Sequence, residues 1–289
     1  MSAGGSVAIV THARAPEIDA DEAGLGPALE ALGVSWCAVP WDDPSFDWSS
    51  VGAVILRSPW DYSRRRDEFL AFCRRAASVT ALHNPMKIVE RNTHKRYLVE
   101  LAEAGVSVIS TSVLQAGECA DIEAFARERG WGDIVVKPAI SAGSWRTWRM
   151  TVGEPSHAWT RARRLAATHD VLVQPYVESV TNAGERALVF IDGVFSHAIR
   201  KRSLFEAESV PYRVPVTPTR DELDLAARVL RAADAECLLY ARVDLARGRD
   251  GQPMLMELEL TEPRLFFTAA PPEATTRFAE AIAGRLGSR

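Results

Sequence analysis

The sequence is poor in cysteine and contains no long apolar run. Its 289 residues include only four cysteines, which stand too far apart to form a CxxC metal or redox motif: Cys37, Cys73, Cys119 and Cys237. No apolar stretch approaches the roughly 18–20 residues that a membrane span requires, and the first ten residues carry no basic cluster typical of a signal peptide. We therefore expect a cytoplasmic protein without a membrane partner, whose thiols are reduced and mostly structural.

An excess of basic charge and two common phosphate-binding motifs are also missing. Acidic residues number 38 against 34 basic ones, giving a net charge of −4, so we expect no nucleic-acid partner. No GxGxxG follows the first predicted strand, and no lysine has the preceding glycine that GxxxxGK(S/T) requires. The composition, 47% hydrophobic and 25% charged, is that of a globular protein.

Lysine is scarce in this chain. Only four of the 34 basic residues are lysines, and the other 30 are arginines. A chain that uses arginine for general positive charge retains lysine where a slim point charge is needed, for example against a phosphate group. The four lysines, Lys87, Lys95, Lys137 and Lys201, are therefore the first candidates for a binding site.

Strands and helices alternate through the first 80 residues. This alternation is typical of a parallel sheet, and the Asn84-Pro85 loop is the expected first domain boundary. The predicted elements are strands 6–10, 34–39 and 51–57 and helices 21–32 and 64–77.

The rest of the chain mixes helices with short strands, so the expected class is α/β (α+β). An Asp-Gly pair at 192–193 lies between two apolar runs and predicts a hairpin of strands 186–191 and 194–200. The other predicted helices are 92–104, 122–129, 156–168, 220–233 and 273–286, and the other extended segments are 106–114, 133–137, 171–177, 241–246 and 254–260.

Three carboxylates lie in the last two predicted strands. Glu257 and Glu259 are two residues apart and so project from one face, and hairpin pairing would bring Asp244 beside them. Carboxylates gathered on one face repel one another unless a cation lies between them, and hard oxygen ligands suit magnesium. The alternative is an ordinary solvated face of an amphipathic strand.

Two lysines lie where a phosphate could bind. Lys137 ends an apolar strand and precedes the small-residue loop 140–144, whose backbone N–H groups could close over an anion. Lys95 falls in the first turn of the predicted helix 92–104, where a cation is unfavourable unless it has an anionic partner. The alternatives are an ordinary edge-of-strand lysine and a simple surface lysine.

Two strand ends complete the candidate features. Arg200 and Lys201 are adjacent cations at the end of the hairpin and favour an anionic ligand, although an exposed basic strand end is the alternative. The segment 174–177 ends another strand, where backbone N–H and C=O groups could face a purine.

The order of these features resembles the ATP-grasp superfamily, specifically its glutathione-synthetase-like members. The resemblance covers about residues 85–289, and residues 1–84 look like the sheet domain that precedes the ATP-grasp lobes. Segments 57–62, 92–95 and 257–263 are most similar to the group that includes a D-cycloserine-forming ligase. The matching features in chain order are Lys95, Lys137 with 141–144, 174–177, 184–186, Arg200, Asp244 and Glu257-x-Glu259.

The resemblance implies an ATP-grasp fold in which two lobes enclose ATP beside an N-terminal parallel-sheet domain. The expected domains are 1–84 for the substrate, 85–178 for the lid lobe and 179–289 for the metal-binding lobe. It implies Arg200 as the catalytic residue that stabilises charge during phosphoryl transfer. The implied nucleotide contacts are Lys95, Lys137, Ser141, Gly143, Ser144, Gln174, Tyr176, Val177 and Glu185.

The resemblance also implies that Asp244, Glu257 and Glu259 hold two Mg²⁺ ions, with Mn²⁺ as the alternative ion. The sequence departs from the common Glu-x-Asn pattern, because Glu259 replaces the asparagine and adds a negative charge. The exact coordination is therefore the part of the resemblance that this departure puts in doubt.

Recognition of the substrate is expected at Arg57, Tyr62 and Arg264. Arg57 ends a strand of the parallel sheet, where ligands commonly bind, and could hold a substrate carboxylate with Tyr62 beside it. A salt bridge at a helix entry is an equal alternative for Arg57. Arg264 follows the carboxylate strand and could serve the same purpose.

The implied activity is an ATP-dependent ligase that forms a C–N bond through an acyl phosphate and releases ADP and phosphate. The implied substrate is a small amino-acid derivative, and the most specific expectation is cyclisation of O-ureido-D-serine to D-cycloserine. The alternatives are an intermolecular amino-acid ligase, an ATP-grasp kinase and a non-catalytic ATP-binding regulatory protein. A homodimer is the expected assembly if the chain is not a monomer.

Overall fold

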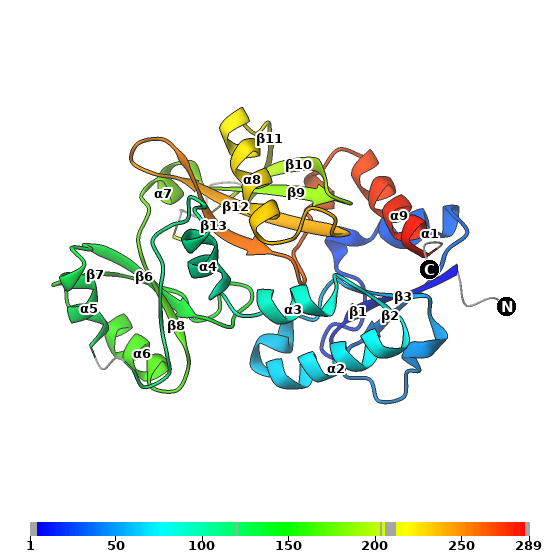
Figure 1. The fold of residues 1–289 in the computed structure, drawn as a ribbon, viewed down its shortest axis with the longest axis horizontal. Coiled ribbons are helices and arrows are strands. Elements are labelled where there is room, and N and C mark those ends of the chain that lie inside the picture. The colour runs from blue at the N-terminus through cyan, green and yellow to red at the C-terminus, as the bar shows by residue number, and fades with distance from the viewer. Residues whose placement is uncertain (1–4, 119–120, 203, 206–211, 287–289) are drawn as a thin grey trace.

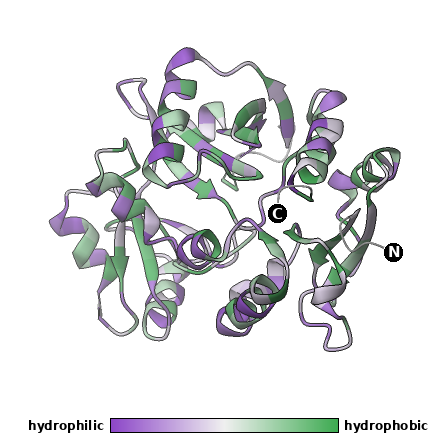
Figure 2. Ribbon diagram, turned by 45° about the vertical axis from the view of Figure 1, so that its right-hand side comes forward, coloured by the Kyte–Doolittle hydropathy of each residue, from purple (hydrophilic) through white to green (hydrophobic). Residues whose placement is uncertain are grey.

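The computed structural model describes residues 5–118, 121–202, 204–205 and 212–286. Within these ranges the chain forms three sheets, one after another along the sequence, with helices around them (Figure 1). In Figure 2 the strands are mostly green and the helices alternate green with purple. Apolar side chains of helices and strands share buried clusters. The mixed α/β class expected from the sequence is confirmed.

The first sheet is parallel, as the alternation of strands and helices predicted. Its order is β2-β1-β3-β4, and every neighbouring pair runs parallel. The sequence did not predict β4, which has only three residues. The elements are β1 (Ser6–Thr11), β2 (Ser35–Pro40), β3 (Ala53–Leu56), β4 (Ala81–His83), α1 (Leu25–Ala31) and α2 (Arg66–Val79), with short helices η2 (Ala20–Glu22), η3 (Trp48–Ser50) and η4 (Trp60–Arg64).

The second sheet is antiparallel, in the order β5-β8-β6-β7. It forms a separate core with two helices that Figure 1 shows on its outer side. Its elements are β5 (Ser112–Leu114), β6 (Asp133–Pro138), β7 (Trp148–Thr151), β8 (Val171–Pro175), α5 (Ile122–Glu128) and α6 (His157–Ala166).

The third sheet is also antiparallel, in the order β11-β10-β9-β12-β13. The predicted hairpin is confirmed, because Asp192 and Gly193 both adopt positive φ in the turn between β9 and β10. The elements are α7 (Ser179–Ala183), β9 (Glu185–Ile191), β10 (Val194–Lys201), β11 (Arg213–Val216), α8 (Arg220–Ala232), β12 (Tyr240–Arg247) and β13 (Pro253–Glu259), followed by η5 (Phe267–Ala269) and α9 (Glu273–Leu286).

Two segments pack against sheets that are distant from them in sequence. Helices α3 (Met86–Asn92) and α4 (Tyr97–Glu103) share a core with the third sheet, in which Leu98 lies with Leu188 and Leu255. Helix α9 returns to the first sheet, where Phe278 packs with Ile9, and it contacts α1 directly (Figure 1). The domain boundaries at 84/85 and 178/179 stay a prediction.

The predicted helix 92–104 is wrong at its beginning. The structure has two shorter helices, and Lys95 lies in the turn between α3 and α4. The backbone N–H of Lys95 donates to the carbonyl oxygen of Ala139 at 2.8 Å. Because this tertiary hydrogen bond takes the N–H out of the helix, the helix-terminus argument for an anion at Lys95 does not hold.

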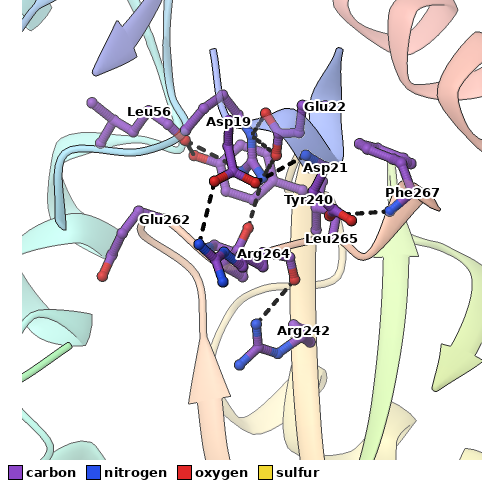
Figure 3. A network of polar contacts seen from close by, with 12 residues as sticks. Asp19, Asp21, Glu22, Leu56, Tyr240, Arg242, Glu262, Arg264, Leu265 and Phe267 are labelled. Carbon is purple, nitrogen blue, oxygen red and sulfur yellow. Dashed lines mark hydrogen bonds and ion pairs between the residues drawn. The ribbon is translucent and has the colours of Figure 1, made fainter. Parts of the chain in front are cut away.

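Hydrogen bonds across the molecule fix the segment that follows β13, residues 260–266, which we call the exit loop. The side chain of Asn84 donates to the carbonyl oxygens of Tyr240 and Leu260 at 2.9 and 2.7 Å. The Tyr240 hydroxyl donates to the carbonyl oxygens of Leu56 and Thr261 at 2.8 and 2.9 Å. These bonds connect the first sheet, the third sheet and the exit loop, and Figure 3 shows part of the network.

Two further expectations concern cysteines and membranes. Cys37, Cys73 and Cys237 are free thiols, and Cys119 lies outside the described residues. Among the helices that the structure describes, none combines the length and the apolar composition needed to cross a bilayer.

The β9–β10 turn generates a stability prediction. A Cβ added at Gly193, where φ is +76°, would lie 2.1 Å from the carbonyl oxygen of Glu236. Gly251, in the β12–β13 turn, has a similar φ of +78° but nothing within 4 Å, so Gly251→Ala is the matched control. Gly251→Ala should cost about 1–2 kcal/mol through the backbone alone, and Gly193→Ala about 1–3 kcal/mol more through overpacking. Urea denaturation of both variants measures the difference, and equal losses would contradict the predicted clash.

Candidate active site

A cavity of about 670 Å³ lies between the second and third sheets and is bounded at one end by the exit loop and Trp60. Its lining contains twelve of the sixteen site residues that the sequence predicted. They are Lys95, Lys137, Ser141, Gly143, Ser144, Gln174, Tyr176, Val177, Glu185, Glu257, Glu259 and Arg264. The chain therefore gathers most of the predicted site, from segments about 170 residues apart, around one volume.

One part of the cavity is an apolar slot. It is lined by Ile109, Val177, Val180 and Met256, which belong to one small hydrophobic cluster. Tyr176 also lines the cavity, and the Arg149 guanidinium lies over its ring at 3.8 Å from the ring centre. Such a slot, bordered by strand-end backbone, fits a flat heteroaromatic ring.

Gln174 forms a fixed polar point beside the apolar slot. It is buried, and its side-chain nitrogen donates to the Thr111 hydroxyl at 2.7 Å. This bond joins β8 to the segment before β5. The side-chain oxygen of Gln174 remains as a hydrogen-bond acceptor.

The other part of the cavity is densely charged, and Lys95 lies at its centre. The Lys95 ammonium donates to the Ser141 carbonyl oxygen at 2.8 Å and pairs with Glu257 at 3.0 Å. Burial disfavours the charge of Lys95, but Glu257 outweighs it and raises the lysine's pKa above the ordinary value. Lys95 therefore ties the small-residue loop to the carboxylate strand.

Lys137 reaches the same volume from β6. Among the described residues no carboxylate lies within salt-bridge distance of its ammonium. Burial lowers the pKa of Lys137, and Lys95 lowers it further against the opposing effect of Glu257. This cation is the one that an anionic ligand would stabilise most.

Lys201 lies between two carboxylates. Its ammonium is 2.6 Å from Glu185 and 2.9 Å from Asp244. Burial disfavours its charge, but Asp244 and Glu185 raise the pKa of Lys201 well above its usual range. Asp244 is fully buried behind the wall and does not line the cavity.

Arg242 is the second cation held by Asp244. Its Nε and Nη2 atoms donate to the two Asp244 oxygens at 2.8 and 2.9 Å, and Nη2 also pairs with Glu259. A third bond, from Nη1 to the Arg264 carbonyl oxygen at 2.9 Å, connects Arg242 to the exit loop (Figure 3). The guanidinium thus lies in the cavity wall with a fixed orientation.

The carboxylates of this region differ strongly in acidity. Burial favours the neutral form of Glu257, Glu259 and Glu262. For Glu257, however, Lys95 and Lys137 outweigh burial and hold its pKa well below the usual range. Burial raises the pKa of Glu259 to about 7, with Asp244 and Glu257 adding to the rise and Arg242 opposing it. Burial and the neighbouring Glu259 raise the pKa of Glu262 to about 8.

The strand register predicted for the carboxylates is confirmed. Asp244 pairs directly with Glu257 across β12 and β13, and Glu257 and Glu259 both line the cavity. No group of three potential metal ligands is preassembled among the described residues. The donor set still fits Mg²⁺, because that ion usually takes one or two carboxylates and completes its shell with water and phosphate oxygens.

Four predicted residues do not line the cavity: Arg57, Tyr62, Arg200 and Asp244. Arg57 is buried in an ion pair with Glu22, donates to the Pro263 carbonyl oxygen at 2.6 Å and lies 4.7 Å from the Tyr240 ring centre. Its position matches the salt-bridge alternative. Tyr62 is buried beside the cavity and hydrogen-bonds to Glu262.

Arg200 and Lys201 have opposite orientations, because neighbouring residues of a strand alternate between faces. Lys201 lines the cavity, whereas the Arg200 side chain passes Gly184 and donates to the Ala183 carbonyl oxygen at 2.9 Å. The catalytic role predicted for Arg200 stays a prediction, and Lys201 is the residue of this pair that lines the cavity.

Arg242, Glu262 and Trp60 line the cavity and were not among the predicted site residues, and Lys201, a candidate for an anionic ligand, was given no role in the site. Arg242 could have been found, because it precedes Asp244 by two residues and therefore shares its strand face. Lys201 carried the signal of a scarce lysine. No sequence signal marks Glu262 or Trp60, since their positions depend on how the exit loop packs against the first sheet.

Comparison with known proteins places the chain in a family. The model described as the N-terminal domain of D-cycloserine synthetase DcsG matches residues 7–84. The cycloserine biosynthesis protein DcsG of Streptomyces lavendulae is 39% identical over 298 residues, which cover 98% of this chain and 99% of that protein.

Solved structures agree with this relationship. The crystal structure of D-cycloserine synthetase DcsG has a TM-score of 0.88 at 39% identity, covering 98% of this chain and 100% of that one. The ATP-grasp ligase PsnB, solved with a minimal precursor, Mg and ADP, has a TM-score of 0.65 at 19% identity over the whole of both chains, a likeness of fold alone. The ATP-grasp fold expected from the sequence is confirmed, and the chain belongs to the D-cycloserine synthetase family of ATP-grasp ligases.

Proposed function

We propose that this enzyme uses ATP to activate the carboxylate of O-ureido-D-serine as an acyl phosphate and then closes the ring to D-cycloserine. The ureido nitrogen bonded to oxygen attacks the acyl carbon and phosphate leaves, and the carbamoyl group on that nitrogen is lost to water as CO₂ and ammonia. The observation that carries the proposal is the cavity itself, which combines an apolar slot with three lysines and an arginine that converge beside two carboxylates. Membership of the D-cycloserine synthetase family supports the choice of product.

The apolar slot is assigned to the adenine ring and the lysine-rich part to the phosphates. Tyr176 and Val177 border the ring, Gln174 offers a polar contact, and Glu185 is assigned to the ribose. Lys95 holds the loop of Ser141, Gly143 and Ser144 against the carboxylate strand, and backbone N–H groups of such loops bind anions. The fold relative PsnB was solved with Mg and ADP, which supports a magnesium nucleotide as the ligand of this cavity.

Glu257 and Glu259 are the residues assigned to Mg²⁺, because they are oxygen donors on the wall beside Lys95 and Lys137. Asp244, which is bound by Arg242 and Lys201, would be a third oxygen donor only if Lys201 gave up this contact for a phosphate. The bound ion supplies neutralisation of phosphate charge, which phosphoryl transfer requires more than covalent help. We propose two ions, with Mn²⁺ as an alternative metal, and metal titration tests both points.

The chemistry assigned to the protein's own groups is charge stabilisation. A free carboxylate is a poor electrophile, and the transfer of the terminal phosphoryl group to it creates a good leaving group. Lys137 and Lys201 bind the transferring phosphoryl oxygens, and the oriented Arg242 faces the oxygen that becomes negative when nitrogen attacks the acyl carbon. Water must be kept away from the acyl phosphate, because it would hydrolyse this intermediate. Gly143 and Ser144 are small, exposed residues of the cavity lining, and we assign to their loop the exclusion of water.

The first test is release of ADP and phosphate with Mg-ATP across a panel of amino acids that includes O-ureido-D-serine. Release that depends on O-ureido-D-serine and yields D-cycloserine supports the cyclising ligase. Release that requires a second amino acid points to an intermolecular ligase, and a stable phosphorylated product points to a kinase. ATP binding without turnover on any acid would contradict the proposal and favour the regulatory alternative.

Lys137 generates the first prediction about the nucleotide. Lys137→Ala should raise the dissociation constant for ATP about 10- to 100-fold, because a charge-assisted contact of about 1.5–3 kcal/mol is lost. Lys137→Arg keeps the charge but should still lose turnover, since the broad guanidinium does not fit a place for a slim ammonium. Lys87→Ala is the matched control, because this lysine is exposed on α3. Calorimetric titration with ATP measures all three, and an unchanged affinity in Lys137→Ala would reject the assignment.

Arg242 and Arg200 generate a second, comparative prediction. Arg242→Lys should lower kcat by about 10²–10³ with nearly unchanged ATP affinity, because the lysine cannot keep the fork of bonds to Asp244 and Glu259. Arg200→Lys should have the smaller effect, since Arg200 does not line the cavity. Steady-state kinetics of both variants decide the matter: a larger loss in Arg200→Lys would return the stabilising role to Arg200.

A further inference from the structure

Almost every charged group of the cavity wall has a partner of opposite charge. Lys95 pairs with Glu257 and Lys201 with Glu185, both from within the wall. Arg242 pairs with Glu259, and Arg264 pairs with Asp19 at 3.3 Å. Among the acidic residues that the structure describes in the wall, Glu262 alone has no cation within 4.0 Å. Among the lysines that line the cavity, Lys137 is the corresponding case, because no carboxylate of the described residues lies within 4.0 Å of its ammonium group.

The surrounding structure holds Glu262 in place. Its carbonyl oxygen accepts a bond from the indole nitrogen of Trp60 at 3.3 Å, and the next residue, Pro263, is held by the buried Arg57. The Tyr62 hydroxyl contacts its carboxylate. Figure 3 draws no ion pair between Glu262 and either of the arginines labelled there. Glu262 is therefore a fixed carboxylate at the cavity edge and not a side chain free to turn into solvent.

The neighbours of Glu262 favour an organic cation as its missing partner. Trp60 and Phe266 also line the cavity, the Trp60 indole contacts the Glu262 backbone, and the Arg264 guanidinium lies 4.6 Å from the centre of the Trp60 ring. A carboxylate that shares a cavity wall with aromatic side chains suits an ammonium group, which can gain from both the charge and a ring. Mg²⁺ would need several further oxygen ligands, and no ligand group of three exists among the described residues.

We propose that Glu262 receives the ammonium group of the substrate and restricts the enzyme to carboxylic acids that carry a free amino group. This inference rests on the proposed function, because it places the substrate in the same cavity as the metal-binding carboxylates and the phosphate-binding lysines. Lys137 and Glu262 then match the two charges that enter the cavity, the phosphate anion and the substrate cation.

The test compares O-ureido-D-serine with 3-(ureidooxy)propanoic acid, which lacks only the ammonium group. Wild-type enzyme should prefer the amino acid by about 10- to 100-fold in kcat/KM, the range of a charge-assisted hydrogen bond. Glu262→Gln should reduce this preference to threefold or less, chiefly through a higher KM for the amino acid, and should leave the ATP dissociation constant within twofold. Glutamine keeps the shape and removes a carboxylate that has no cationic partner, so the fold should be retained.

A conservative variant separates charge from structure. Glu262→Asp keeps the carboxylate and should keep the preference for the amino acid with a higher KM. Loss of the preference in both variants, or its persistence in Glu262→Gln, would overturn the assignment. A shift in the Mg²⁺ requirement of Glu262→Gln with unchanged preference would also overturn it, because the residue would then belong to a metal site.

The proposed function and this inference fail in different ways. If the wild-type enzyme turns over and Glu262→Gln keeps the preference for the amino acid, only the role of Glu262 is rejected. If no acid supports turnover, the proposed function fails, and the role of Glu262 is then judged from binding. Thermal shifts of the ATP-bound wild-type enzyme should be larger with the amino acid than with its deamino analogue, and Glu262→Gln should remove the difference; equal shifts in the wild type would reject the inference.

Discussion

One buried carboxylate organises the charged part of the cavity. Asp244 is fully buried on β12 and holds Arg242 on one side and Lys201 on the other. Burying an isolated carboxylate is strongly unfavourable, so both cations are needed to keep Asp244 ionised. In return, Asp244 sets the direction in which each cation faces the cavity. The ion pairs with Asp244 thus fix the positions of Arg242 and Lys201, while N–H groups of both side chains that face the cavity remain available to a ligand.

The first sheet controls the site through the exit loop more than through its own strand ends. Arg57, although it ends β3, does not line the cavity but binds the Pro263 carbonyl oxygen from a buried ion pair with Glu22. Asn84 fixes the Leu260 carbonyl oxygen in the same manner. Residues that the sequence suggests as ligand contacts thus act as supports, since a buried arginine with a carboxylate partner has its charge already satisfied. The fold uses one domain to position the loop that closes a cavity between the other two sheets.

The parts of the site that the sequence predicted are those that depend on local geometry. Alternation along β13 and hairpin pairing with β12 were enough to bring Asp244, Glu257 and Glu259 together. The scarcity of lysine pointed to Lys137. Lys95 was predicted in the right site for a wrong reason, because a hydrogen bond to Ala139, 44 residues away, removes it from the helix. Glu262 is outside the reach of such arguments, since its environment comes from elements that only the folded chain assembles.

The charge pattern of the cavity wall is compatible with the charged reaction of the proposed function without a rearrangement of the backbone. Lys201 and Arg242 each contact two carboxylates. Either cation can therefore exchange one carboxylate for a phosphate while its second carboxylate holds it in place. A carboxylate released in this exchange becomes an oxygen donor beside the same phosphate, where a divalent cation is favoured. Each exchange replaces one opposite-charge contact with another, and the buried groups are never left without a partner. A wall built from shared ion pairs therefore suits the magnesium nucleotide of the proposed function, even though no metal cage is preassembled among its described residues.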